Sequence, residues 1–146
     1  HAMGRQGETA TLHEYAPKYA EYNSTVGTQD LPVRAVRQVN LVSLDTYCLE
    51  HNLDPDLIKI DVEGAELAVV QGAVRLLGER PRVVAVELRR PDFDTHYAAV
   101  VQWLRQQGYV PRLIDSEGKL VQVDDVRSAL FNSGLDSDNV IFIRNR

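Results

Sequence analysis

D-L-I-K-I-D-V-E-G-A-E-L, residues Asp56 to Leu67, is the stretch that decides the fold of this chain. A short apolar run is followed by two acids and a glycine, and a helical pattern begins at once. This order is typical of a buried strand that passes into a helix, and ligands of open α/β sheets bind at the carboxyl ends of such strands. Since Asp61 and Glu63 are costly to place there for packing alone, we expect them to belong to a functional site.

The sequence on either side of this stretch alternates between strand and helix patterns. The predicted strands are Leu57–Val62, Arg82–Leu88, Tyr109–Asp115 and Val140–Arg144, and the predicted helices are Ala65–Leu77 and Asp94–Gln107. Short connections between such elements imply right-handed crossovers and a parallel sheet. Residues 128–138 are predicted to form a loop, with no obvious crossover helix before the last strand. We therefore expect that strand to be inserted antiparallel.

The N-terminal part is predicted to extend this sheet structure with β-strands. Glu8–Glu14 and Val33–Val42 alternate as strands do. Tyr15–Asp30 contains a proline, a glycine and several polar residues, and it is predicted to form a long irregular loop. Ser43 can cap a short helix from Leu44 to about His51.

Length and composition describe an ordinary globular protein. With 146 residues, 44% of them hydrophobic, the chain is long enough for one domain with a real core. A formal charge of −5 gives no electrostatic case for binding nucleic acid or an anionic membrane. No apolar run approaches the roughly 20 residues of a membrane helix, and the single Cys48 fits a cytoplasmic location. His1-Ala2-Met3 looks like a cloning or tag remnant, so the domain is predicted over residues 4–146.

Several sequence blocks resemble a known family, the FkbM-type methyltransferases. The blocks are G-R-Q-G-E-T-A-T-L (Gly4 to Leu12), N-S-T (Asn23 to Thr25), V-S-L-D-T-Y (Val42 to Tyr47), I-K-I-D-V-E-G-A-E-L-A-V-V-Q-G-A (Ile58 to Ala73) and R-V-V-A-V-E-L (Arg82 to Leu88). Members of this family transfer a methyl group from S-adenosylmethionine, commonly to a hydroxyl of a sugar or natural product. The resemblance implies the Rossmann-like sheet of class I methyltransferases.

One part of the family pattern has no counterpart here. The family begins with a strand that ends in a glycine-rich turn, which lets backbone approach the nucleotide, and no glycine before Gly64 follows a strand in that way. We therefore expect the C-terminal half of the family fold: three parallel strands with helices, and a last antiparallel strand. Such a chain is expected to bind S-adenosylmethionine weakly or not at all, and to be inactive alone.

The resemblance also suggests roles for the residues of the central block. It places Asp61 beside the transferred methyl group, where a carboxylate can take the proton of a hydroxyl or orient it. Glu63 is the second catalytic candidate, as a group that orients the acceptor. Gly64 can permit the tight turn into the helix and, with Asp61, is the candidate for contact with the cofactor. The neighbouring Lys59 is predicted to extend to solvent or to pair with an acid.

Ser24, Glu66 and Glu87 are candidates for contact with the methyl acceptor, and each has a plainer explanation. Ser24 lies in a polar loop of a common kind. Glu66 falls in the first turn of a helix, where the dipole stabilises an acid by about 0.3–1 kcal/mol. Glu87 ends a strand and can pair with Arg89 or Arg90. The histidines His13, His51 and His96 share no spacing, so no metal is expected, although metal-assisted hydrolysis by the strand-end acids is a remote third reading.

The strand that carries Asp61 is also expected to lie at the open edge of the sheet. Long apolar edges pair with other chains, and among Leu57, Ile58 and Ile60 only Lys59 offers protection. We therefore expect a homo-oligomer formed through this edge or by exchange of residues 8–42. This leaves a second reading of the chain, a non-catalytic module that binds a partner or itself.

Overall fold

A computed structural model describes residues 2–4, 7–18 and 32–144 of the chain. The chain divides into two compact units, which are described separately. The first comprises the residues up to Leu53 together with Val62–Val74, and the second comprises Asp54–Asp61 together with the residues from Arg75 onward. The single domain over residues 4–146 stays a prediction.

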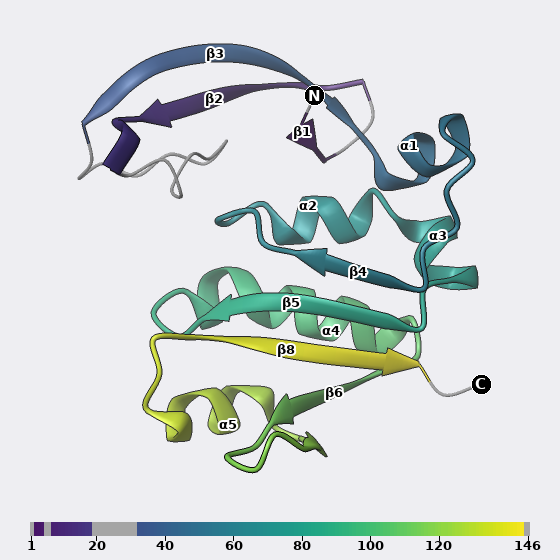
Figure 1. Ribbon diagram of the computed structural model, residues 1–146, viewed down its shortest axis with the longest axis vertical. Coiled ribbons are helices and arrows are strands. Elements are labelled where there is room, and N and C mark those ends of the chain that lie inside the picture. The colour runs from purple at the N-terminus through teal and green to yellow at the C-terminus, as the bar shows by residue number, and fades with distance from the viewer. Residues whose placement is uncertain (1, 5–6, 19–31, 145–146) are drawn as a thin grey trace. The chain divides into compact units, whose positions relative to one another are not determined.

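The first unit contains a three-stranded sheet in the order β1-β3-β2 (Figure 1). Its strands are β1 (Ala2–Met3), β2 (Thr9–Tyr15) and β3 (Val33–Val42). β2 and β3 pair antiparallel over nearly their whole length, and both were predicted, β3 with these bounds. The expected cloning remnant contributes β1, which runs parallel to the end of β3.

A short helix follows β3 in this unit, as predicted. α1 spans Leu44–Glu50, and the hydroxyl of its N-cap residue Ser43 accepts the amide of Thr46 at 3.1 Å. Cys48 is the buried residue of this helix. The capping prediction is confirmed.

The prediction of one helix over residues 65–77 is wrong. Two short helices, α2 (Glu66–Gln71) and α3 (Val74–Glu79), occupy this stretch. The break is at Gly72, whose carbonyl accepts the amide of Asp45 at 3.1 Å. A Cβ at Gly72 would lie 2.4 Å from the carbonyl oxygen of Gly4, so only glycine fits there. Contacts from distant parts of this unit therefore end the helix.

The second unit is built on a five-stranded mixed sheet in the order β4-β5-β8-β6-β7 (Figure 1). Its strands are β4 (Leu57–Ile60), β5 (Val83–Arg89), β6 (Tyr109–Ile114), β7 (Leu120–Gln122) and β8 (Ser137–Arg144). β4 and β5 are parallel, and β8 is antiparallel to both of its neighbours, β5 and β6. The predicted antiparallel insertion of the last strand is confirmed. The chain is thus an α/β protein with mixed sheets, and a Rossmann-like arrangement stays a prediction.

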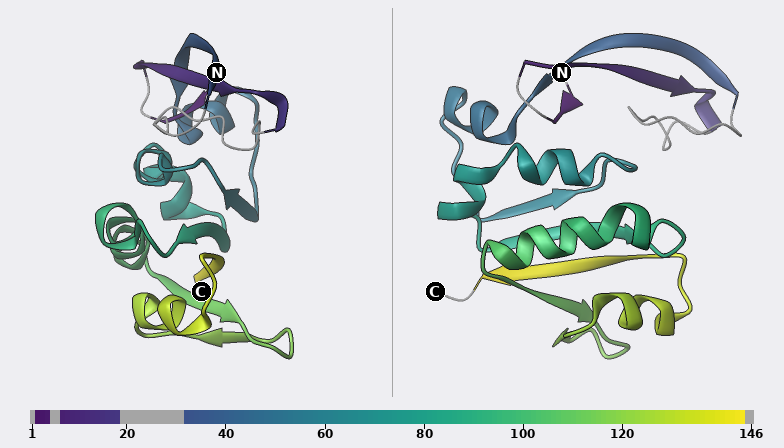
Figure 2. Two further views of the ribbon diagram at one scale, coloured as in Figure 1. Left: turned by 90° about the vertical axis from the view of Figure 1, so that its left-hand side faces the viewer. Right: turned by 180° about the vertical axis from the view of Figure 1, so that it is seen from behind.

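The longer helices of the second unit lie on one face of this sheet. A π-helical turn (η2, Phe93–Tyr97) leads into α4 (Ala98–Gln106), and α5 spans Val126–Ser133. Figure 2 shows α4 and α5 on the same side of the strands. The helix predicted over 94–107 is confirmed, although its first turn is π-helical. The loop predicted over 128–138 is wrong in its first half, where α5 forms. Asp125 caps α5 by accepting the amide of Ser128 at 3.0 Å.

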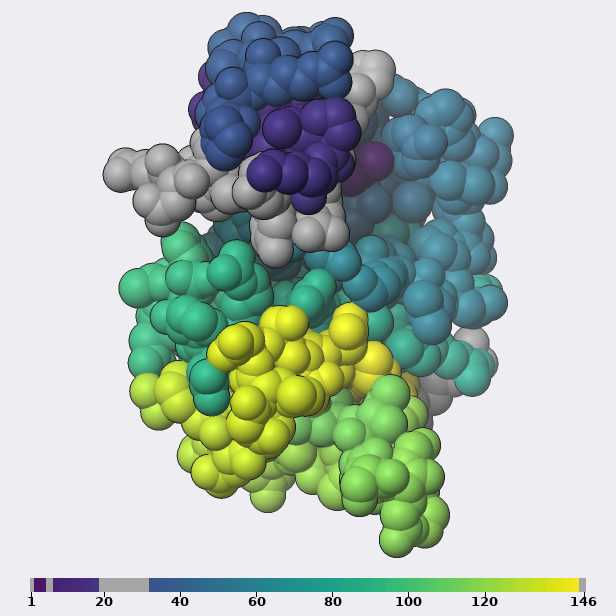
Figure 3. Space-filling view, turned by 60° about the vertical axis from the view of Figure 1, so that its left-hand side comes forward, coloured from purple at the N-terminus to yellow at the C-terminus, as the bar shows by residue number. Residues whose placement is uncertain are grey.

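Side-chain alternation along the strands sets the core of this unit. The fully buried residues of β5 and β8 are Val84, Val86, Leu88, Val140 and Phe142. Their neighbours along β5 and β8 point to the opposite face and keep partial exposure, except for the buried Ala85. β6 and β7 form a hairpin that projects from this unit in Figure 3. The predicted turn between them is closed by a hydrogen bond from the amide of Asp115 to the carbonyl of Lys119 at 2.9 Å.

Candidate functional site

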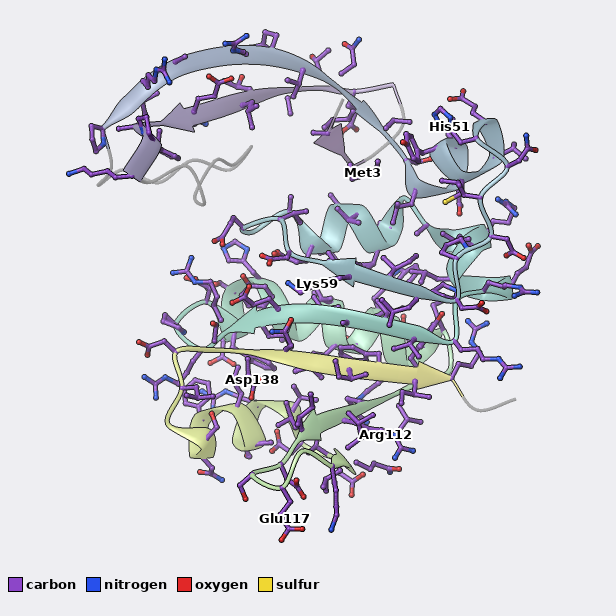
Figure 4. The ribbon with its side chains drawn as sticks, in the orientation of Figure 1. Met3, His51, Lys59, Arg112, Glu117 and Asp138 are labelled. Atoms are coloured by element: carbon purple, nitrogen blue, oxygen red, sulfur yellow. The ribbon has the colours of Figure 1, made fainter. Side chains whose placement is uncertain are left out.

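Asp61 lies immediately beyond the carboxyl end of β4. The strand ends at Ile60, two residues earlier than predicted. Lys59, which Figure 4 marks on β4, places its Nζ atom 2.6 Å from Asp61 Oδ2. The two side chains keep 49% and 41% of their surface exposed. The predicted pairing of Lys59 with an acid is confirmed, and the partner is the main catalytic candidate.

Glu87 lies on the adjacent parallel strand β5, two residues before its end at Arg89, so the prediction that it ends the strand is wrong. The register pairs Ile60 with Val86, so Asp61 and Glu87 both follow the same pair of residues. The Glu87 carboxylate accepts a hydrogen bond from the Ser137 hydroxyl at 2.7 Å. The predicted ion pairs of this acid are wrong, because Arg89 pairs with Asp92 and Arg90 pairs with Asp136. Ser137, on β8, was missed, since 50 residues of chain separate it from Glu87.

Glu63 and Gly64 form the turn that leads into α2. Both have positive φ values, 51° at Glu63 and 100° at Gly64. Glycine adopts such values at no steric cost, whereas a residue with a side chain adopts them rarely. The predicted conformational role of Gly64 is confirmed, and Glu63 shares the unusual conformation.

Glu66 is the first residue of α2, and its carboxylate faces the backbone of the preceding turn. Its two oxygens lie 3.0 and 3.2 Å from the amide nitrogen of Gly64, and Oε1 also accepts the amide of Val62 at 3.4 Å. The side chain is nearly fully buried, with 2% exposure. The prediction of an acid in the first helical turn is confirmed, and the expected role in acceptor binding stays a prediction.

One protein-family model matches most of the chain. A family model described as the methyltransferase FkbM domain matches residues 2–111. The chain belongs to the FkbM methyltransferase family. The same comparisons match the chain to no curated protein and to no solved structure.

The two residues of this FkbM domain that were expected to contact the cofactor, Asp61 and Gly64, both have hydrogen-bond partners within the chain. The Gly64 amide is already bonded to Glu66, so it does not point to a ligand. One Asp61 oxygen is bonded to Lys59. Asp61 can still offer its other oxygen, which suits a hydroxyl or ammonium donor.

The remaining predictions for the FkbM domain concern Ser24, metal binding and a membrane-spanning helix. Ser24, with Asn23 and Thr25, falls outside the described residues. Over residues 2–4, 7–18 and 32–144, no three His, Cys, Asp or Glu side chains gather as metal ligands do. Within the same ranges, no helix is long and apolar enough to span a membrane.

A pocket of about 590 Å³ lies between α4 and the start of α5, in the second unit. Phe93, Val101 and Val126 contribute apolar surface to it, and Arg105 and Arg127 lie at the same pocket. None of the candidate site residues lines it. This pocket is thus separate from Asp61 and Glu87.

Proposed function

We propose that this FkbM family chain carries the acceptor side of an S-adenosylmethionine-dependent methyltransferase that methylates a hydroxyl of a sugar or natural product. Family membership supports methyl transfer as the reaction. The observation that carries the acceptor-side role is the position of Asp61, half-exposed just beyond β4 and held by Lys59. Glu87, in register on the next strand, adds a second carboxylate toward the same carboxyl ends of β4 and β5.

The proposed chemistry asks little of the protein beyond alignment and removal of a proton. S-adenosylmethionine supplies an electrophilic methyl group when bound. The acceptor hydroxyl forms the new oxygen–carbon bond as the methyl–sulfur bond breaks, with S-adenosylhomocysteine as the leaving group, and Asp61 takes the hydroxyl proton as general base. Lys59 directs the Asp61 carboxylate by holding one of its oxygens. Glu87 and Glu63 are the next groups that could orient the acceptor.

The test replaces Asp61 and compares it with a matched acid at the other end of the strand. Asp61→Asn should lower methyl transfer by roughly 100-fold or more, the usual contribution of a general base. Asp56→Asn is the control, because Asp56 precedes β4 and pairs with Arg80 at 3.2 Å. Transfer of labelled methyl groups to a panel of sugars is measured for the chain alone and for the chain supplied with a glycine-rich cofactor-binding half of the FkbM family. An active enzyme that tolerates Asp61→Asn would disprove the proposed role.

A second candidate function is self-association through β4. In its own unit this strand has a sheet neighbour on one side only. Leu57, its first residue, is 59% exposed. Edges of this kind pair with other chains, and a charge such as Lys59 weakens the pairing. Sedimentation at tens of micromolar should show association that Leu57→Lys reduces, and a monomer of the unchanged chain would exclude this function.

A further inference from the structure

We infer that Glu66 is a positioning residue that holds Glu63 in its left-handed backbone conformation, rather than a residue that contacts the methyl acceptor. The amides that Glu66 binds belong to the residues on either side of Glu63. The importance of this arrangement for catalysis rests on the proposed function. The arrangement itself rests on the geometry of residues 62–66, all within the first unit.

The burial of Glu66 requires the partners that it has. An ionised carboxylate that leaves water must be hydrogen-bonded or paired with a cation. Within the part of the chain that the structure describes, no cation lies in ion-pair contact with Glu66, and its partners are the backbone amides of Val62 and Gly64. Charge-assisted bonds of this kind are among the stronger hydrogen bonds. The carboxylate therefore satisfies amides of the turn that precedes α2.

Glu63 is the residue that needs this support. Its φ of 51° is disfavoured for any residue with a Cβ, because the side chain crowds the backbone. Gly64 has a φ of 100° without this penalty. Strained residues of this type persist only where their surroundings hold them, and they are common at functional sites. Bonds to the amides before and after Glu63 are such a constraint.

The contacts also argue against a direct role in ligand binding. Oε1 accepts two amides, and Oε2 accepts the amide of Gly64. With 2% of its surface exposed, Glu66 has almost no area for a ligand to reach.

A double-mutant cycle tests this role by relieving the strain at Glu63. Glycine adopts the left-handed conformation freely, so Glu63→Gly removes the strain. We expect Glu66→Ala to lower the folding equilibrium constant about fivefold less with glutamate at position 63 than with glycine there, because loss of the support lets the turn relax and release strain only where residue 63 has a Cβ. Glu63→Ala is the control, because alanine removes the carboxylate but keeps the strain; with alanine at position 63, Glu66→Ala should cost as much as with glutamate. Equal costs in all three backgrounds would overturn the inference.

A second variant covers the case in which Glu66→Ala does not fold. Glu66→Gln keeps one oxygen acceptor but removes the charge. Its Gly64 amide should exchange with solvent at least about tenfold faster than in the unchanged chain, a factor that corresponds to about 1.4 kcal/mol. The three-bond coupling between the amide and α protons of Glu63 should move at the same time. Unchanged exchange and coupling in a folded Glu66→Gln variant would contradict the role.

These measurements do not depend on methyl transfer. If no acceptor is ever methylated, the cycle and the exchange rates still decide the role of Glu66. If Asp61→Asn abolishes activity while the cycle shows no coupling, the proposed function stands and the inference about Glu66 fails.

Discussion

Lys59 and Asp61 form an ion pair of 2.6 Å between Nζ and Oδ2 at the carboxyl end of β4. Residues two apart on a strand project to the same side, so β4 itself places the cation beside the acid that follows it. The pair is partly exposed, with 49% and 41% of the side-chain surfaces open to solvent. The pair therefore matters more for the orientation of Asp61 than for the stability of the fold.

Replacing Lys59 with methionine should separate these two effects. Exposed ion pairs contribute about 0–1 kcal/mol, so the free energy of unfolding should change by less than about 1 kcal/mol. Methyl transfer should fall severalfold, because the Asp61 carboxylate loses its orientation. Lys119→Met is the matched control, since Lys119 and Glu117 form an equally short pair on the β6–β7 turn. Equal activity of the two variants would show that the Lys59 pair has no role in the reaction.

Gly72→Ala should destabilise the protein by about 2 kcal/mol or more, the scale of a steric conflict in a packed interior. The added methyl group would lie 2.4 Å from the carbonyl oxygen of Gly4. Gly78→Ala is the control, because a Cβ there meets no atom within 4 Å and alanine favours the helix. Chemical denaturation should therefore give changes of opposite sign. A stable Gly72→Ala variant would show that the contact with Gly4 is not maintained in solution.

Tyr109→Phe should cost about 1–2 kcal/mol, because the hydroxyl donates to the carbonyl of Pro81 at 2.6 Å and its removal takes this donor away. Tyr47→Phe, at a partly exposed tyrosine, should change the free energy of unfolding little.

The pH dependence of Tyr109 has a definite sign. Burial raises the pKa of Tyr109 above its usual value of 10.0, against a smaller lowering by Arg144. The folded state therefore keeps the phenol proton where the unfolded state releases it. This stabilisation is fully present below pH 10 and is lost as the pH rises through the raised pKa. The difference in unfolding free energy between the unchanged chain and Tyr109→Phe should shrink over that range, and parallel curves would contradict the assignment.

The ion pair between Asp94 and Arg127 predicts the opposite dependence. Two hydrogen bonds of 2.8 Å from Arg127 lower the pKa of Asp94 below 3.8. Its stabilisation is present above pH 3.8 and is lost as the pH falls through the lowered pKa. Asp94→Asn should therefore destabilise the chain at neutral pH but not in strong acid, as urea titrations would measure. In an Arg127→Met background, Asp94→Asn should have no such pH-dependent effect.

Local patterns predicted the elements whose residues interact with near neighbours. β3 follows the alternation of residues 33–42, and the face of α4 formed by Val100, Val101 and Leu104 follows helical spacing. Ser43 caps α1 through an amide three residues away. The identity of the family also came from contiguous residues, because the block around Asp61 is read along the chain.

The same patterns failed where distant residues compete for a backbone group or a side chain. Helical spacing continues through Gly72, but the contacts with Gly4 and Asp45 end α2 there. Glu87 has adjacent arginines in the sequence, yet it binds Ser137 because β5 and β8 pair antiparallel.

The sequence by itself determined the family, the main strands of the second unit and the acids that follow or lie in them, since periodicity and motif are properties of neighbouring residues. Only the tertiary structure decided which groups those acids contact. Asp61 is held by Lys59, and Glu66 is buried against the amides on either side of Glu63. The physical reason is that a carboxylate accepts hydrogen bonds from whichever donors the folded backbone brings within about 3 Å of it.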